Sequence, residues 1–549
     1  MTLKQWIQKK VLGLLQVSQN NQLPSEEERL TFINDKQAMA RMRVREYNVW
    51  YAGDSEELLN FYTHGNTISY YYEPFYMRNK KGYFWAINST ESDIKRTHSG
   101  QPKNIVDILT AIMGLPEVVG GPKELPEFYN KVNKTLQNIL DDNNFWDTYE
   151  QEQVPYTMVE GWGCWKVAWD TDVSQYPIPM YYRAENVDFI YKLNRITGVI
   201  FKDYYSDGKR RYLITETRYT AHGDLIIEKE LFEVLGSVED EAALKKIEFE
   251  EVPAFSVVEK KLVVENYTGL LAVPCIFLKD PTGDTPGRSL FAGKVDLFDD
   301  LDQALSQSAN TVRKSTPVEY FDTDFLERDR KTGMPIQPKV YDRKYIMVKG
   351  ATSADGTSMS REPVTVTQPN LDFSKYSTEA VQILLQIMNG IISPATLGMD
   401  IAKKDNAEAQ REKEKVTIFT RNKLARAEKN ILEKLFNELL IANELMHSGT
   451  VTVFDYTISV NYPEFADESF ENKITILGEM LAKGALSYKM YLTKLYGGSL
   501  SEEDYKQELE FLEEFHKAGE EDPFAGGDEE MMDNESQLQE EAGANPFGM

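Results

Sequence analysis

The chain has 549 residues, a formal net charge of −27 and a globular composition in which 41% of residues are hydrophobic and 11% are aromatic. This length exceeds what one compact core supports, so we expect two or more domains. Ten acidic and no basic residues between Glu520 and Met549 contribute −10 of the charge. An acidic chain is a poor candidate for coating DNA non-specifically, because that binding requires Lys and Arg to displace counterions from phosphate.

Cysteines and apolar runs limit the cellular setting. Cys164 and Cys275 are the only cysteines, and each lies among apolar residues, which predicts two buried reduced thiols and a reducing cytoplasm. No apolar run reaches the roughly 18 residues that a membrane span requires, so no membrane partner is expected. Residues 1–16 mix lysines with apolar side chains, and this pattern fits a membrane-surface helix or a small docking helix; we favour the docking helix.

The first third of the chain has mainly helical patterns. A helix is predicted over residues 25–63, interrupted at Gly53, with a second helix starting at Asp54. Further helices are predicted from Ile105 to Met113 and from Pro126 to Phe145.

The spacing of hydrophobic residues then changes from a helical to an alternating pattern. A strand is predicted over Trp162 to Asp170, and Tyr212 to Tyr219 followed by His222-Gly223-Asp224 and Leu225 to Val234 predicts a β-hairpin. Residues 1–285 therefore read as a helical lobe that carries an antiparallel sheet.

A helix–insert–helix pattern follows. The first helix ends before Pro317, with Val295, Phe298, Leu301, Leu305 and Ser308 predicted on one face and Asp296, Asp299, Asp300 and Asp302 on the others. Short strands are predicted at Val318 to Phe321, Tyr345 to Val348 and Val364 to Thr367, and a second helix at Phe373 to Ile392.

The longest predicted helix has no glycine or proline between Met399 and Ser448. If wholly helical, this stretch would extend for about 75 Å. Its predicted apolar stripe consists of Phe419, Leu424, Ala427, Ile431, Leu435 and Leu439. A strand is expected over Thr450 to Val460, helices over Asp467 to Lys483 and Ser501 to Lys517, and disorder in the last thirty residues.

No catalytic constellation is present in the sequence. The five histidines have no metal-ligand spacing, and Gly283 to Ser289 lacks the order of a phosphate-binding loop. Helical spacing distributes the aspartates between 296 and 302 around a cylinder, which favours a solvated or pore-lining face over a Mg²⁺ site. We therefore expect no catalytic residue, no metal and no cofactor, and a role in recognition and assembly.

Several stretches, taken in their order along the chain, resemble the portal proteins of tailed bacteriophages, which are the siphophage-like head-to-tail connectors. The resemblance covers about residues 45–445, and its most specific part is Ser393-Pro394-Ala395-Thr396-Leu397-Gly398 followed by Asn406-Ala407-Glu408-Ala409. The other matching stretches are Trp50 to Leu58, His98 to Lys103, Gly161 to Asp170 and Gly287 to Phe291.

The resemblance implies an α+β, mainly helical portal fold with long stem and wing helices, an antiparallel β wing subdomain and a small α/β clip insert. It assigns 1–285 to the wing, 286–316 to a stem helix, 317–370 to the clip and 371–392 to the returning stem helix. It further assigns 393–406 to a tunnel loop, 407–464 to the long wing helix and a strand, 465–520 to a helical crown and 521–549 to an acidic disordered tail.

Site residues follow from these assignments. The tunnel loop would bring Met399, Lys403, Lys404, Asp405 and Asn406 to the DNA channel; for the two lysines, plain surface solvation remains an equal alternative. The stem would line the channel with Asp296, Asp299 and Asp300, and the clip would offer Arg328, Lys331, Lys339 and Arg343 for docking.

The implied function is a non-enzymatic ring, usually of twelve subunits, at one capsid vertex. The ring would conduct double-stranded DNA during packaging and ejection and would be found in the virion, after assembly in the host cytoplasm. Its expected partners are the terminase large subunit, the major capsid and scaffolding proteins and a head-completion adaptor. The first alternative is another ring-forming viral structural protein that does not conduct DNA. The second is an enzyme, such as a packaging nuclease or ATPase; the missing phosphate-binding loop and the lack of a convincing carboxylate cluster argue against it.

Overall fold

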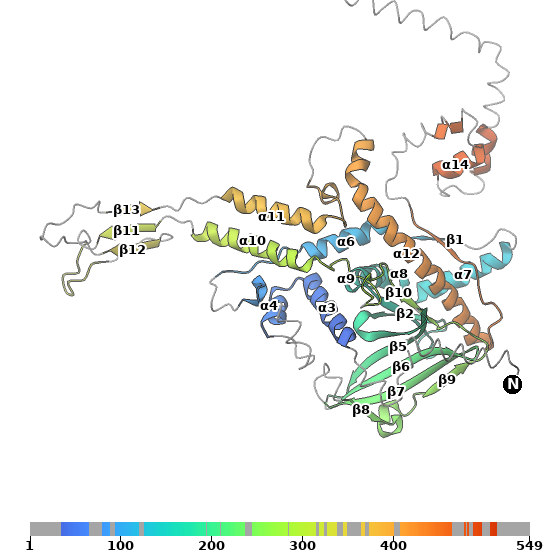
Figure 1. Ribbon diagram of the computed structural model, residues 1–549. Coiled ribbons are helices and arrows are strands. Elements are labelled where there is room, and N and C mark those ends of the chain that lie inside the picture. Colours follow the sequence, from blue (N-terminus) through green and yellow to red (C-terminus); the bar gives the residue numbers. More distant parts are fainter. Residues whose placement is uncertain are drawn as a thin grey trace, which may run out of the picture. The chain divides into compact units, whose positions relative to one another are not determined.

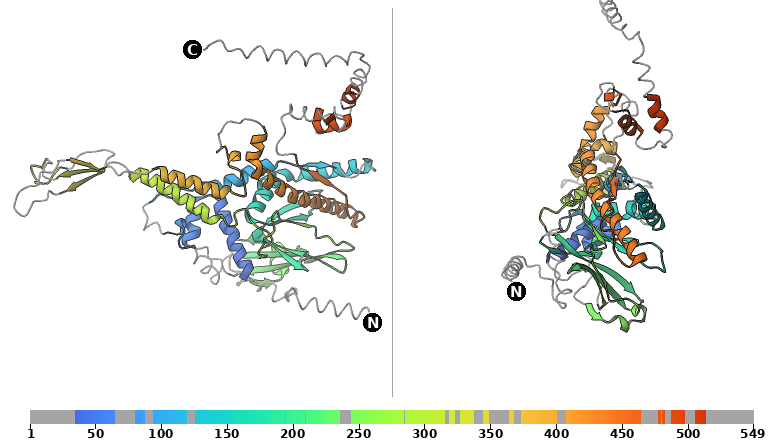
Figure 2. Two further views of the ribbon diagram at one scale, coloured as in Figure 1. Left: turned by 45° about the horizontal axis from the view of Figure 1, so that its top comes forward. Right: turned by 90° about the vertical axis from the view of Figure 1, so that its right-hand side faces the viewer.

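The protein is an α+β chain (Figure 1; Figure 2). The computed structural model describes residues 35–64, 80–87, 94–119, 126–193, 195–208, 210–235, 244–283, 285–314, 318–322, 327–336, 344–348, 364–367, 373–399, 407–463, 477–478, 480–481, 487–496 and 505–512. The chain divides into two compact units, Met1–Phe465 and Ala466–Met549. No helix in the described ranges is both long enough and apolar enough to cross a membrane. The predictions for residues 1–34 and 521–549 lie outside these ranges.

Three helices open the described part of the first unit: α3 (Asp35–Ala52), α4 (Ser55–His64) and α6 (Gln101–Met113). The predicted break between the first two is confirmed. Gly53 adopts a left-handed φ of +71°, and the Asp54 carboxylate accepts hydrogen bonds from the backbone N–H groups of Glu56 and Glu57 at 2.7 and 3.2 Å. A glycine and a capping aspartate therefore separate the two helices.

The next helical region is longer than predicted. α7 (Pro126–Asp142) is followed, after Asn144, by α8 (Phe145–Thr148), a π-helical turn η2 (Tyr149–Gln153) and α9 (Val154–Glu160). Pro155 lies inside this helical run and has no N–H to donate, which accounts for the local change from α to π hydrogen bonding.

Two antiparallel sheets follow in the first unit. The three-stranded sheet has the order β10 (Ala272–Cys275), β2 (Gly163–Ala168), β3 (Ile178–Arg183), with β2 at its centre. The larger sheet has the order β4 (Val187–Lys192), β5 (Arg195–Ser206), β6 (Arg211–Ala221), β7 (Asp224–Val234), β8 (Leu244–Ile247), and β9 (Lys261–Val264) pairs with the other end of β7.

The predicted hairpin is confirmed. Ala221 pairs with Asp224, so the turn between β6 and β7 consists of His222 and Gly223 alone, with φ angles of 58° and 98°. Two successive positive φ angles define the hairpin turn whose twist suits antiparallel strands. Cys164 and Cys275 are buried free thiols on β2 and β10, as predicted.

A small buried ion network lies between β2 and β6. The Glu216 carboxylate contacts the Lys166 ammonium at 2.9 Å and accepts a hydrogen bond from Arg218 Nε at 2.7 Å. Arg218 Nη1 also donates to the carbonyl oxygens of Val167 and Leu271, at 2.9 and 2.5 Å. Through these contacts the larger sheet is joined to the three-stranded one, and a cavity of about 280 Å³ adjoins the network.

A helical hairpin carries the insert. α10 (Val295–Lys314) and α11 (Phe373–Met388) pack side by side (Figure 1), and between them in sequence are β11 (Val318–Asp322), β12 (Lys344–Val348) and β13 (Val364–Thr367). β11 is central, parallel to β12 and antiparallel to β13. The three predicted strands are confirmed. The second helix ends at Met388 rather than Ile392, because Gly390 takes a left-handed φ of 78°.

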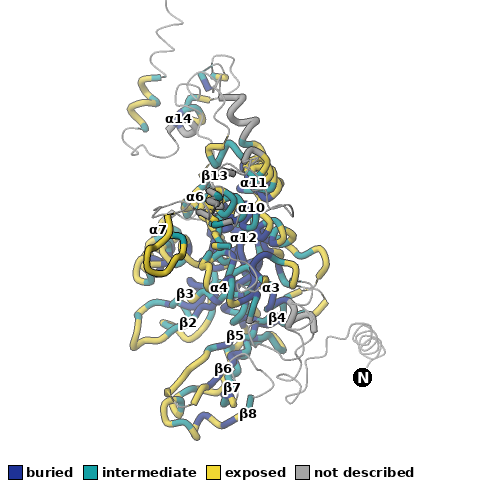
Figure 3. Tube along the Cα trace, turned by 90° about the vertical axis from the view of Figure 1, so that its left-hand side faces the viewer, coloured by how far each residue is buried: buried dark blue, intermediate teal, exposed yellow. Residues whose placement is uncertain are grey.

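The long helix α12 (Ala407–Ser448) begins where predicted and ends before Gly449, whose φ is 70°. It packs against α6, α7, β2, β10 and the segment before it. The buried part of the trace lies mainly between α12 and the larger sheet (Figure 3). Leu424, Ile431, Leu435 and Leu439 are buried as predicted. Phe419 is not part of this stripe, since it is 62% exposed.

The predicted strand over Thr450 to Val460 is wrong for most of its length. Only β14 (Ser459–Asn461) is a strand, and it pairs with β1 (Glu117–Val119). Side chains of α12 provide the hydrogen bonds that a neighbouring strand would have made. Asn437 accepts from the N–H of Tyr456 at 2.9 Å, and Glu444 accepts from the N–H of Thr452 at 3.1 Å.

In the second unit, α14 (Tyr488–Tyr496) was not predicted. Of the helix predicted over Asp467 to Lys483, the structure describes only residues 477–478 and 480–481, which are helical. Of the helix predicted over Ser501 to Lys517, it describes only residues 505–512, which are also helical. The Tyr505 hydroxyl donates to the carbonyl of Lys489 at 2.9 Å and joins 505–512 to α14.

Candidate functional site

The candidate site is the α10–insert–α11 hairpin together with the junction that leads into α12. Two buried carboxylates of α10 fix this hairpin to the N-terminal segments. Asp299 is 4% exposed, and its two oxygens accept hydrogen bonds from the backbone N–H groups of Phe84 at 2.7 Å and Trp85 at 3.2 Å. Phe84 and Trp85 belong to a short 3₁₀ turn, η1 (Phe84–Ala86). Burial raises the pKa of Asp299 to about 6, against the effect of these two hydrogen bonds.

Asp302, one turn further along α10, is fully buried. Its Oδ2 accepts from the indole Nε1 of Trp85 at 3.1 Å and lies 2.7 Å from His98 Nδ1, and its Oδ1 accepts from the N–H of Ser99 at 2.8 Å. Ser306 extends the same row, accepting from the N–H of Thr97 at 2.9 Å. This face of α10 therefore binds backbone and side-chain donors of residues 84–99.

The expected channel-lining role of Asp299 is corrected by these contacts, and so is the solvated face expected for Asp302. Both carboxylates are enclosed by donors of the same chain and cannot face a channel. The spacing in the sequence could have indicated the burial of Asp302. Val295, Phe298, Asp302 and Ser306 follow the i, i+3, i+7, i+11 pattern of one buried helix face. The polar identity of two of these residues concealed it.

The other two aspartates are exposed. The Asp296 side chain is 80% exposed, lies 3.8 Å from the Lys80 ammonium and accepts a hydrogen bond from the Tyr83 hydroxyl. Burial raises the pKa of Asp300, as do the like charges of Asp296 and of Glu379 on α11. Asp296, Asp300 and Glu379 thus form an acidic surface that spans α10 and α11; we call it the hairpin acidic surface.

Apolar side chains are also exposed on the hairpin. On α10, Leu305 (36% exposed), Ala309 and Val312 (51% exposed) recur at i, i+4 and i+7. On α11, Val381 and Leu385 are 48% and 42% exposed. Each helix therefore presents an apolar stripe in addition to the face that it packs against its neighbour.

The junction after α11 is bound to α12 by hydroxyl groups. Thr417 of α12 is fully buried, and its Oγ1 accepts from the N–H of Ser393 and lies within hydrogen-bond distance of Thr396 Oγ1, both at 2.8 Å. The 3₁₀ turn η7 (Pro394–Leu397) follows, and Met399 is 39% exposed. Lys403, Lys404, Asp405 and Asn406 lie outside the described residues.

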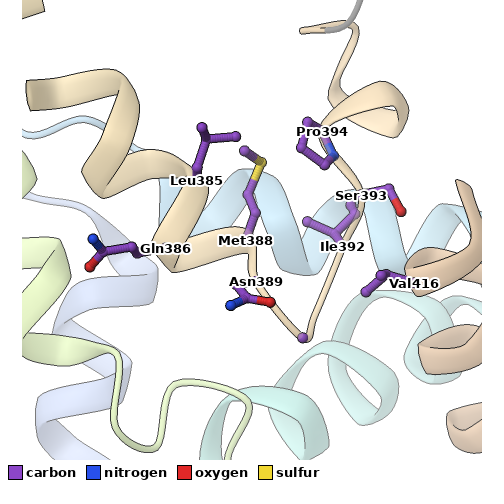
Figure 4. Close-up of a pocket in the computed structure, with 9 residues that line it drawn as sticks. Leu385, Gln386, Met388, Asn389, Ile392, Ser393, Pro394 and Val416 are labelled. Carbon is purple, nitrogen blue, oxygen red and sulfur yellow. The ribbon is translucent and has the colours of Figure 1, made fainter. Parts of the chain in front are cut away.

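A cavity of about 330 Å³ opens at this junction (Figure 4). It is lined mainly by apolar atoms of Leu385, Met388, Ile392, Pro394 and Val416. Beside it, the Lys294 ammonium donates to the carbonyl oxygens of Gln386 and Asn389, at 2.7 and 3.1 Å. A cation at the carbonyl end of α11 satisfies groups that the helix leaves unpaired.

In the insert, Arg328 and Lys331 are exposed on a tight turn over residues 327–336. The backbones of Arg328 and Pro335 form an isolated antiparallel β-bridge. The Asp329 carboxylate accepts a hydrogen bond from the N–H of Lys331 at 2.9 Å. Met334 and Ile336 on the same turn are 70% and 49% exposed, so the turn offers apolar contacts beside its charges. Lys339 and Arg343 lie outside the described residues.

Within the described ranges, no group of three or more His, Cys, Asp or Glu side chains is placed to hold a metal ion. No protein-family model matches the chain, and no curated protein matches it at a significant level.

Proposed function

We propose that the chain is the subunit of a portal ring at one vertex of a bacteriophage capsid, a dodecameric conduit for double-stranded DNA. The observation that carries this proposal is the order of parts: two paired helices separated by a three-stranded insert, a short junction bound to the next helix, and then a 42-residue helix. The sequence resemblance assigns these parts, in the same order, to a stem helix, a clip, a returning stem helix, a tunnel loop and a wing helix.

Ring formation requires a heterologous interface that closes on itself, with different surfaces of each subunit in contact. The apolar stripes of α10 and α11 suit such contacts, because burial of their exposed side chains against a neighbouring hairpin would remove apolar area from water. Leu305 on one copy and Val381 on the next are the residues that we expect to be buried by assembly.

The hairpin acidic surface supports passage of DNA through the ring. Carboxylates at Asp296, Asp300 and Glu379 would repel phosphate, so DNA could slide without being held. Asp299 has no part in this surface. Lys403 and Lys404 would provide weak contacts that salt screens and that are repeated around the ring.

We assign each proposed partner to a separate part of the chain. The insert, with Arg328 and Lys331 on its exposed turn, would dock the terminase large subunit during packaging and the head-completion adaptor afterwards. The N-terminal lobe would contact the major capsid and scaffolding proteins. The chain itself would perform no chemical step; the terminase would supply the ATP-driven work in the host cytoplasm, and the ring would stay in the virion.

Negative-stain microscopy and mass photometry of the purified chain test this proposal, with Val381→Glu compared with Val257→Glu. Val381 is 48% exposed on α11, whereas Val257 is 92% exposed on a loop outside the hairpin. We expect rings from the wild type and Val257→Glu and smaller species from Val381→Glu, because a carboxylate would have to be desolvated at the interface. Wild-type monomers or dimers under all conditions would contradict the proposal. Rings that form normally but never permit DNA to enter heads would favour a structural ring without a conducting role.

A further inference from the structure

A buried carboxyl group lies in the middle of α12, away from the hairpin and independent of the proposed function. Glu428 is fully buried, and so is Gln153, the last residue of the π-helical turn η2. Gln153 Nε2 donates to Glu428 Oε2 at 3.0 Å. This hydrogen bond joins α12 to the N-terminal lobe across 275 positions of sequence.

Each member of this pair has a second oxygen without a partner among the described residues. Glu428 Oε1 and Gln153 Oε1 are both buried, and neither has a hydrogen-bond donor there. Two unsatisfied buried acceptors in one contact would cost about 1–3 kcal/mol each, more for a charged oxygen. Both oxygens are acceptors, so one added proton between them would satisfy the two at once.

No donor of the described neighbouring residues makes a hydrogen bond to either oxygen. From β10, the Cys275 thiol donates to the Val273 carbonyl at 3.6 Å, and its sulfur also has a hydrogen-bond contact with the Gln153 side chain. From η2 and from the segment after β14, the hydroxyls of Tyr149 and Tyr462 pair with each other at 2.6 Å.

Charged groups near the pair do not neutralise it either. On α12, Arg421 lies two turns before Glu428, and its Nη2 donates to the carbonyl oxygens of Met113 and Pro463. Glu150, on η2, is exposed and carries the same sign of charge as an ionised Glu428. In the part of the chain that the structure describes, an ionised Glu428 would therefore be buried with one hydrogen bond and no paired cation.

We infer that Glu428 is a neutral carboxylic acid in the folded protein and that its Oε1–H donates to Gln153 Oε1, closing a two-hydrogen-bond acid–amide pair between α12 and η2. The carboxylate takes up one proton from solvent on folding and returns it when the pair is broken. Above the pH at which that proton is lost, the hydrogen bond to Gln153 Oε1 is lost and only the one from Gln153 Nε2 to Glu428 Oε2 remains, so the pair is a pH-sensitive link between α12 and the lobe.

The electrostatics agree with this geometry. Burial raises the pKa of Glu428 to about 8, and the hydrogen bond from Gln153 only partly opposes the rise. In the unfolded chain the side chain has the ordinary glutamate pKa of 4.5. Between these two values the folded state binds the extra proton, so stability falls as pH rises through this window and is constant above it.

Infrared spectroscopy of the full-length wild-type protein tests the protonation directly. We expect a buried carboxylic acid C=O band at about pH 6 that disappears with a midpoint near 8. The band should be absent from Glu428→Gln and should move to the frequency of an acid without a hydrogen bond in Gln153→Leu. A wild-type spectrum that lacks the band at about pH 6, or a band that Gln153→Leu leaves unmoved, would overturn the inference.

Thermal unfolding against pH provides a second measurement with a matched control. In Glu428→Gln the amide can donate to Gln153 Oε1 and accept from Gln153 Nε2, so the decline of Tm between about pH 6 and 8 should disappear. Glu438→Gln changes a half-buried glutamate of α12, whose pKa burial raises to about 6, and should keep that decline. Parallel wild-type and Glu428→Gln curves over this range would contradict the inference.

Discussion

The indole Nε1 of Trp85 donates a hydrogen bond to the Asp302 carboxylate at 3.1 Å, joining residues 217 positions apart in the chain. Because His98 Nδ1 and the N–H of Ser99 contact the same carboxylate, Asp302 fixes the start of α10 to the lobe. The helices that carry the insert are therefore attached at their base by several buried hydrogen bonds, although their outer faces are exposed.

Asp302→Asn should lower the free energy of unfolding of the first unit by roughly 3 kcal/mol. The amide nitrogen must replace one of the two oxygens, so it would oppose the N–H of either Trp85 or Ser99. Chemical denaturation followed by tryptophan fluorescence measures the change. Asp300→Asn, at an exposed position of the same helix, is the control and should leave the midpoint within experimental error. Equal midpoints for the two variants would contradict the anchoring role of Asp302.

Acid stability should depend on Glu216. Burial alone would raise its pKa, but Arg218 and Lys166 hold the pKa of this carboxyl at about 2, below its ordinary value of 4.5. The stabilisation is present above pH 4.5 and is lost as pH falls towards 2. By linkage, the ionised network contributes on the order of 3 kcal/mol.

The variant Glu216→Gln should therefore be destabilised at neutral pH and should lose less of its remaining stability on acidification than the wild type. Unfolding midpoints at several pH values between about 2 and 7 measure both effects. Glu248→Gln is the control, because its side chain is 64% exposed beside Lys260 and a surface ion pair contributes little. If Glu216→Gln and the wild type lost stability in parallel on acidification, the network would not be the cause.

Local signals in the sequence were sufficient for several elements. His222 and Gly223 fix the β6–β7 hairpin because two residues with positive φ allow only a narrow set of turns. The strands of the insert also followed from short-range patterns. Each of these depends on residues adjacent in the chain.

The contacts that were missed depend on partners far away in the sequence. Asp299 and Asp302 look like surface residues until the donors of residues 84–99 are brought to them, and Glu428 gives no sign that it is buried until η2 packs against it. Residues 450–458 have strand-like alternation, but Asn437 and Glu444 bind their backbone instead. Propensity predicts local conformation, whereas these outcomes are set by tertiary contacts.

Replacement of Lys403 and Lys404 with alanine tests the proposed contact with DNA. If these side chains meet phosphate in the channel, the double variant should form rings normally but package or retain DNA differently, with an effect that shrinks as salt rises. In vitro packaging at several ionic strengths measures this. Lys423→Ala with Lys434→Ala, at exposed positions of α12, is the matched control. No difference between the two double variants at any ionic strength would leave Lys403 and Lys404 as ordinary surface residues.

The hydroxyl of Thr417 should control how firmly the junction before α12 is held. Thr417→Val keeps the size of the side chain but removes the acceptor for the N–H of Ser393 and the partner of Thr396 Oγ1, leaving a buried donor unsatisfied at a cost of about 1–3 kcal/mol. Because this cost falls on the junction, we expect faster amide exchange at residues 393–399 with little change in the sheets. Hydrogen–deuterium exchange with mass spectrometry measures it. Thr420→Val, one turn along the helix, should leave exchange at the junction unchanged, and equal exchange in the two variants would show that the Thr417 hydroxyl does not hold the junction.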